Sequence, residues 1–234
     1  MRNKKRGIYA RCIKRILDIL LSGLALIVLS PVLLVVAVLV RAKLGSPVIF
    51  CQMRPGRNEK IFKMYKFRSM TNARDEKGEL LPDDVRLTKF GKVLRATSLD
   101  ELPELWNIFK GNMSIVGPRP QLVRDMVFMT QEQRRRHTAL PGLTGLAQVN
   151  GRNAISWEDK LQTDLRYVEH ITFVGDVKII AQTVKKVLSH EDISADGMDT
   201  AEDFGDYLLR TGRVSEEEYK KRQAESKALL DAVQ

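Results

Sequence analysis

Two adjacent carboxylates, Asp100 and Glu101, are the side chains of this chain with the clearest chemical potential. They stand just ahead of Pro103, a residue suited to the first turn of a helix, and we expect that helix to run to Gly111. Free N–H groups at a helix start favour anions, which predicts an ionised Asp100 beside a bound phosphate. An ionised aspartate can attack phosphorus, and a neighbouring glutamate can hold the Mg²⁺ that neutralises phosphate oxygens.

The same pair has a purely structural interpretation. Ser98 and Glu101 have the S-x-x-E spacing of a capping box, in which two side chains satisfy N–H groups at a helix start. Asp100 would then be ordinary first-turn charge. Capping acids are common and catalytic carboxylate pairs are rare, so the pair alone favours capping. The two roles are compatible, because a cap would also fix Asp100 where a phosphate arrives.

Basic side chains offer partners for a diphosphate. Alternating apolar residues from Ile61 to Phe67 predict a strand that places Lys66 and Arg68 on one face. Lysine would meet a diphosphate as a point charge and arginine as a bidentate fork. The alternative for both is a solvated basic edge. Arg119 stands between two prolines in a stiff turn, which lowers the cost of fixing its guanidinium against an anion.

The net charge of +10 is spread unevenly over the 234 residues. Residues 1–15 carry seven Lys or Arg and no acid, whereas residues 191–234 carry six basic and twelve acidic side chains. A basic middle region suits an enzyme of anionic substrates or a nucleic-acid binder. Low aromatic content and the lack of a nucleic-acid-binding motif make the binder the weaker hypothesis. Cys12 and Cys51 lack C-x-x-C spacing, so neither a zinc site nor a disulfide framework is predicted.

An apolar segment near the N-terminus predicts contact with a membrane. Residues 16–40 carry one charge, Asp18, and at about 1.5 Å per residue could cross the ~30 Å hydrocarbon core. Ser30-Pro31 lies near the middle and predicts a kink, and both flanks are basic, which places both ends on the cytoplasmic side. These features favour a re-entrant helix over a kinked single span. Asp18 is expected at the interface or paired with Arg15.

The remaining patterns are helical. Residues 86–94 predict a basic amphipathic helix that lies in the membrane interface or covers the core. Residues 121–136 predict a helix whose final arginine run is solvated or faces lipid. Three further helices are expected over residues 157–168, 174–188 and 215–233. The first two carry apolar stripes expected chiefly to face the core, and the third is expected to be an appendage or contact helix.

An apolar segment broken at Ser-Pro is followed in order by RPG, KFRSM, LDELPELWN, VGPRP and PGLTGLAQVNGR. This combination resembles the bacterial sugar transferase family, the monotopic polyprenol-phosphate phosphoglycosyl transferases, over roughly residues 13–188. Because several uncommon motifs recur with compatible spacing, the resemblance favours catalysis over capping alone at Asp100 and Glu101. The motifs GRNAISW, GELL and RLTKFGK are similar to the branch that transfers phospho-N,N′-diacetylbacillosamine. Residues 191–234 lie outside the resemblance.

The resemblance implies a two-step reaction at the cytoplasmic face of the bacterial inner membrane. Asp100 would attack the sugar-linked phosphate of a UDP-sugar and expel UMP, and the phosphosugar would then pass to undecaprenyl phosphate. Glu101 would bind Mg²⁺. The bend at Ser30 and Pro31 would place the active site at the level of the lipid headgroups.

The resemblance also implies binding roles by motif position. Lys66 and Arg95 would lie near the acidic pair and assist phosphate binding, Arg119 would support the diphosphate, and Arg152 would approach the nucleotide. Asp164 matches an acidic position in a D-x-x-Y-V pattern, where it would orient an arginine or touch ligand; a structural ion pair is the alternative.

The predicted fold is mainly α with short β segments. A basic N-terminus with the re-entrant helix over residues 1–45 and interfacial amphipathic helices would hold a compact catalytic domain, residues 46–190, at the cytoplasmic face. Residues 191–234 would form an acidic segment and a C-terminal helix. That helix could serve homo-oligomerisation or contact with another enzyme of the same pathway.

Overall fold

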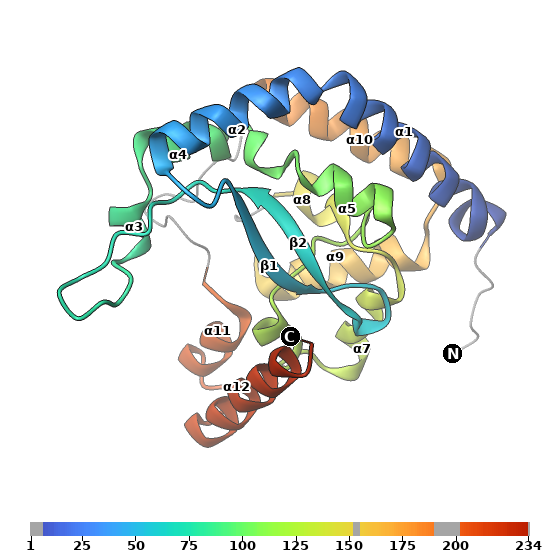
Figure 1. Ribbon diagram of the computed structural model, residues 1–234. Helices are drawn as coiled ribbons and strands as arrows, with labels where there is room; N and C mark the ends of the chain where they lie inside the picture. The colour runs from blue at the N-terminus through green and yellow to red at the C-terminus, as the bar shows by residue number, and fades with distance from the viewer. Residues whose placement is uncertain (1–6, 152–154, 190–201, 234) are drawn as a thin grey trace.

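The computed structural model describes residues 7–151, 155–189 and 202–233 (Figure 1). Within them the fold is mainly helical with two small two-stranded sheets, which confirms the predicted class. The helices and strands follow in chain order: α1 (Lys14–Val28), α2 (Ser30–Leu44), β1 (Ile49–Pro55), β2 (Ile61–Phe67), α3 (Asp83–Arg86), α4 (Lys89–Ala96), α5 (Glu104–Lys110), β3 (Ser114–Val116), α6 (Val123–Met126), α7 (Gln131–Arg134), β4 (Gly142–Thr144), α8 (Leu146–Val149), α9 (Trp157–Glu169), α10 (Phe173–Ser189), α11 (Phe204–Arg210) and α12 (Glu216–Asp231).

Helices α1 and α2 form one bent unit along one side of the molecule (Figure 1). The chain from Tyr9 to Val28 meets α2 at 63°. The break lies where the sequence predicts it, with Pro31 in the first turn of α2, where a missing N–H breaks no helical hydrogen bond. The Ser30 hydroxyl donates to the Ile27 carbonyl at 2.7 Å and so satisfies an acceptor freed by the bend.

No single helix of the described residues is long and apolar enough to cross a bilayer, whereas the bent pair meets that test by length and composition. Large apolar side chains cover its outer surface: Ile16, Leu20, Leu24, Ile27, Val28, Leu34, Val35 and Val38 are all exposed. The inner surface of α2 packs on the rest of the protein through Val36, Val40 and Leu44, which join Phe67 and Leu94 in one cluster.

Polar contacts anchor α1 on the body of the protein. Arg15 donates to the carbonyls of Ile108 and Phe109 at 2.6 and 2.9 Å, near the end of α5, where basic groups complement the free carbonyls. Asp18 is only 2% exposed, and its Oδ1 accepts the Ile115 N–H at 2.9 Å. The expected pairing of Asp18 with Arg15 is therefore wrong, because both side chains bond to backbone groups that only the tertiary structure brings to α1. The expected position of Asp18 at the membrane interface stays a prediction.

Helix α10 contacts Tyr9 and the first residue of α1, Lys14. Asp176 near its N-terminus accepts hydrogen bonds from Tyr9 at 2.7 Å and Lys14 at 2.5 Å. The prediction that its apolar stripe chiefly faces the core is wrong for most of the stripe, since Val177, Val184 and Val187 are exposed. These three valines are left uncovered by the protein, as are the outer surfaces of α1 and α2.

The β1–β2 hairpin is antiparallel and confirms the strand predicted over residues 61–67. Side chains alternate across a strand, so Phe62, Met64 and Lys66 share one face. Phe62 and Met64 pack against Leu105 and Ile108 of α5. Lys66, the next residue on that face, is therefore directed toward the start of α5.

Two short strands, β3 and β4, pair in parallel, with Ser114 opposite Gly142. A Cβ on Gly142 would lie 2.1 Å from the Gly117 nitrogen, so these glycines allow two backbones to approach. The helix predicted over residues 121–136 is wrong: α6 and α7 are separate. Thr130 starts α7 with a capping box closed by Gln133, and a new cap requires an extended residue that breaks a continuous helix.

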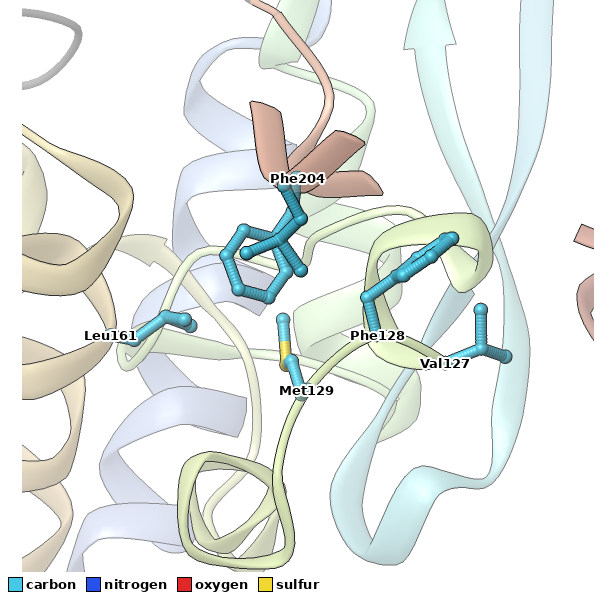
Figure 2. Close-up of a cluster of buried hydrophobic side chains, with 6 residues drawn as sticks. Val127, Phe128, Met129, Leu161 and Phe204 are labelled. Atoms are coloured by element: carbon cyan, nitrogen blue, oxygen red, sulfur yellow. The ribbon is translucent and has the colours of Figure 1, made fainter. Parts of the chain in front are cut away.

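Helices α11 and α12 lie at the end of the molecule away from α1 and α2 (Figure 1). Phe204 and Leu208 of α11 join Val127, Phe128, Met129 and Leu161 in a buried cluster. Figure 2 shows Phe204 next to Leu161 of α9 and Met129. The described C-terminal residues thus share a hydrophobic core with the segment after α6.

Candidate active site

Asp100 and Glu101 lie on a 3₁₀ turn, Leu99–Glu101, just before α5. Ser98 precedes it with a left-handed backbone, φ 54°, and its side chain makes no capping hydrogen bond. The predicted capping box is therefore wrong. The expected helix is also shorter, because α5 begins at Glu104 and ends against Gly111. From this turn the Glu101 carboxylate contacts Lys66 of the hairpin.

Glu101 is held by two cations from distant parts of the chain. Its Oε1 lies 2.8 Å from the Lys66 ammonium and 2.7 Å from the Arg119 guanidinium. Burial alone would raise the pKa of Glu101, but the Arg119 and Lys66 charges outweigh it and hold the pKa well below its usual range. Glu101 is therefore ionised across the physiological range. The structure brings together three residues that the sequence analysis named.

Asp100 is in a different electrostatic state from its neighbour. It is 8% exposed, and burial, with the Glu101 charge adding to it, raises the Asp100 pKa to about 6. Lys66, Arg119 and Arg95 oppose that rise without cancelling it. At neutral pH most molecules still carry the predicted charge on Asp100. A carboxylate with a pKa close to the working pH is both available and more basic than a free aspartate.

A third carboxylate, Glu104, was missed by the sequence analysis. It is 3% exposed, and its Oε1 lies 3.1 Å from the Lys66 ammonium. Burial raises the Glu104 pKa to about 7, with Lys66 opposing the rise and Glu101 adding to it. The available signal was spacing, because residues three apart on a helical stretch share one side. Lys66 is thus fixed between two acids rather than free on a basic edge.

The turn that carries Arg119 is anchored through its backbone. Arg136 donates to the Arg119 carbonyl at 2.6 Å, and Arg54 donates to the Pro120 carbonyl at 3.3 Å. Arg136 is also paired with Asp164, with nitrogen–oxygen distances of 3.0 and 2.7 Å. Arg136 is 1% exposed, so the expectation that its run lies on the surface is wrong for this residue. The pair of Asp164 with Arg136 fits both the arginine-orienting role that the resemblance implies and the structural ion pair that was its alternative.

The other predicted binding residues lie in three situations. Arg95 donates to the Ser69 hydroxyl at 3.0 Å and lies close enough to Asp100 to lower its pKa. Arg68 is 6% exposed and donates to the carbonyls of Met70 and Ser46, so its guanidinium orders nearby chain instead of meeting the acidic pair. Arg152 lies outside the described residues.

Comparison with known proteins supports the family resemblance that the motifs suggested. A sequence model for the family described as "Bacterial sugar transferase" matches residues 9–190. The chain belongs to the bacterial sugar transferase family. It is 50% identical over 192 residues to the uncharacterized sugar transferase EpsL of Bacillus subtilis, covering 82% of this chain and 95% of that protein. This sugar transferase is therefore an enzyme.

Other relatives include longer proteins. The chain is 43% identical over 183 residues to the UDP-glucose:undecaprenyl-phosphate glucose-1-phosphate transferase of Klebsiella pneumoniae, which covers 74% of this chain but only 39% of that protein. It is 40% identical over 191 residues to the exopolysaccharide production protein PSS of Rhizobium leguminosarum, covering 76% of this chain and 96% of that protein. The sugar transferase thus matches whole short relatives and one part of longer ones.

The donor set of the sugar transferase suits a metal that arrives with substrate. Among the described residues, no group of three or more His, Cys, Asp or Glu side chains is placed to hold a metal ion. Mg²⁺ is commonly held by one or two carboxylates together with substrate phosphates. The ionised Glu101 receives both cations on Oε1. Glu101 is thus a carboxylate that would fit Mg²⁺ shared with a diphosphate.

Proposed function

We propose that this sugar transferase moves a sugar phosphate from a UDP-sugar to undecaprenyl phosphate and releases UMP. The observation that carries the proposal is the juxtaposition of Asp100 with the Glu101–Lys66–Arg119 ion-pair network. Support also comes from relatives named as sugar phosphotransferases of undecaprenyl phosphate, such as the undecaprenyl-phosphate galactose phosphotransferase of Salmonella typhimurium, 37% identical over 199 residues.

The first step uses Asp100 as a nucleophile. A carboxylate oxygen attacks the phosphorus that carries the sugar, an Asp–phosphate bond forms, and the bond from that phosphorus to the bridging oxygen breaks. UMP leaves with that oxygen and its electron pair. Lys66 and Arg119, which both pair with Glu101, would neutralise the phosphate oxygens as charge moves onto UMP. The raised pKa of Asp100 keeps its oxygens nucleophilic.

The second step restores the enzyme. A phosphate oxygen of undecaprenyl phosphate attacks the phosphorus on Asp100, a new diphosphate forms, and Asp100 leaves as a carboxylate. Splitting the transfer in this way lets one nucleophile serve a soluble donor and a lipid acceptor in turn. Mg²⁺ held by Glu101 and the diphosphate would supply charge neutralisation.

An acceptor that resides in the membrane accounts for the apolar side chains that the protein exposes on its surface. Close to the acidic turn, α5 exposes Trp106 and Phe109, which stack with ring centroids 5.7 Å apart. The outer surfaces of α1, α2 and α10 are apolar as well. Apolar surface of this extent is expensive in water and favourable in lipid. We infer that α1 and α2 enter and leave the bilayer on the cytoplasmic side, bending at Ser30 and Pro31, with the acidic turn at headgroup depth.

The identity of the transferred sugar has to be determined with a panel of UDP-sugar donors. The motif resemblance favours UDP-N,N′-diacetylbacillosamine, whereas the names of relatives include glucose, galactose and N-acetylgalactosamine. Each UDP-sugar should be tested for UMP release by the full chain in lipid nanodiscs that contain undecaprenyl phosphate. Release with one donor and not the others would define the substrate.

The covalent step has its own test. Asp100→Asn should abolish UMP release, and Asp84→Asn, at an exposed position on α3, should leave it unchanged. Intact mass spectrometry of the parent with donor alone should detect a phosphosugar adduct located on Asp100. Normal turnover by the Asp100→Asn variant would rule out the covalent mechanism. Omitting Mg²⁺ or adding EDTA should suppress UMP release in the parent.

A further inference from the structure

Residues 202–233 lie beyond the part of the chain that matches the family, which ends at residue 190. They nevertheless contact two segments that border the proposed site. One is the chain that follows the Arg119 turn, and the other is the start of α9. Figure 2 shows the shared core, where Phe204 lies among side chains of both segments.

The first contact passes through a buried carboxylate. Asp125 is 2% exposed, and its two oxygens accept different backbone N–H groups: Oδ1 takes that of Phe204 at 2.9 Å and Oδ2 that of Leu122 at 3.0 Å. Leu122 is three residues after Arg119. One side chain therefore links the start of α11 to the end of the Arg119 turn. The Arg222 guanidinium of α12 adds a hydrogen bond to the Val127 carbonyl.

The second contact fixes the beginning of α9. The Trp157 indole donates to the Glu202 carbonyl at 3.1 Å, and its ring lies 5.1 Å from that of Phe204. Glu158 accepts from the Tyr207 hydroxyl at 3.1 Å and pairs with Arg213. Helix α9 also carries Asp164, which pairs with Arg136. Arg136 in turn donates a hydrogen bond to the Arg119 carbonyl. The contacts through Asp125 and those through α9 therefore both lead to the turn that carries Arg119.

We propose that α11 and α12 form a clamp that positions the Arg119 turn for the donor diphosphate, so that Phe204 and Arg222 are positioning residues of the reaction. The assignment rests on the proposed function. Arg54 and Arg136 hold the turn from the protein body, and Asp125 ties it to Phe204 on the other side. Loss of the clamp leaves Arg119 chemically intact but no longer confined near Glu101.

The test uses the full chain in nanodiscs and two matched pairs of variants. Phe204→Ala empties the shared core, and Phe204→Leu keeps it mostly filled. Arg222→Gln removes the bond to Val127, and Lys221→Gln alters its exposed neighbour. The readouts are KM and kcat for UMP release, and hydrogen exchange of the amides from residue 119 to residue 129.

The clamp predicts that Phe204→Ala and Arg222→Gln raise KM for the UDP-sugar, lower kcat/KM on the order of tenfold to a hundredfold, and speed exchange at Leu122. Phe204→Leu and Lys221→Gln should remain close to the parent. Faster exchange with unchanged kinetics would overturn the proposal, as would unchanged exchange in both variants. If Phe204→Ala does not fold, Arg222→Gln decides. A parent that releases no UMP from any donor refutes the proposed function, while the exchange data still judge the clamp.

Discussion

Asp100→Asn should make the protein more stable while removing its proposed activity. Burial, reinforced by Glu101, raises the Asp100 pKa from 3.8 to about 6, so the folded state holds the charged carboxylate at a cost. The shift of roughly two pKa units corresponds to about 3 kcal/mol of unfolding free energy at pH 8. Asparagine carries no charge and avoids that cost. Stability sacrificed at a reactive group is a recurrent property of active sites.

The sign of the pH dependence follows from the raised pKa. Between pH 3.8 and about 6 the folded state binds more protons at Asp100 than the unfolded state does, so stability at this site falls as pH rises through that window. The advantage of the asparagine variant should therefore be full at pH 8 and about half as large at pH 5. For a chain of this size the pH 8 advantage corresponds to a Tm increase of roughly 6 to 12 °C.

The assay is thermal unfolding of the parent, Asp100→Asn and Asp84→Asn in the same nanodiscs at pH 5 and pH 8. Asp84 is exposed on α3, so its variant reports the effect of losing one surface charge. A Tm of Asp100→Asn equal to or below that of the parent at pH 8 would refute the reasoning that burial dominates at Asp100. An advantage that grows toward acid pH would refute it as well.

Further outcomes follow from the same contacts. Single-turnover UMP formation by the parent should fall about tenfold from pH 7 to pH 5, because only ionised Asp100 attacks; a flat profile would contradict this. Asp164→Asn should destabilise the fold by about 3 kcal/mol, since it leaves Arg136 charged and buried, and denaturant titration at pH 7.5 measures this. Glu104→Gln should raise the activation free energy by more than it changes the free energy of unfolding, because Lys66 loses one of its two anchoring acids. Measuring kcat and Tm for this variant and the parent checks this prediction. Val184→Glu should weaken liposome binding without changing the far-UV spectrum, and undiminished binding would show that α10 stays off the lipid.

Much of the fold was predictable because its signals are local. Proline without an N–H and serine with a free hydroxyl placed the break between α1 and α2 at Ser30 and Pro31. Alternation of apolar residues predicted β2, and the helical spacing of apolar residues predicted α9. Ordered motifs identified the family before any contact was known. Local periodicity failed over residues 121–136, where a second cap inside the stretch ends one helix and begins another.

The site depended on contacts between residues that are far apart in the chain. The amino-acid sequence alone named Asp100, Glu101, Lys66 and Arg119 through motifs, yet it could not show that Lys66 and Glu101, 35 residues apart, form an ion pair. Nor could it distinguish a capping glutamate from one that binds cations, since both need the same spacing.

Tertiary structure decided which charges are buried, and burial decides their state. The sequence predicted Arg136 to be one of three surface arginines, whereas in the structure it is buried and paired with Asp164 of α9. Asp100 and Glu101 are neighbours of similar chemistry, but packing gives one a raised pKa and the other a lowered one. The physical reason is that desolvation and ion pairing act over a few ångströms in space, and sequence separation does not encode those distances.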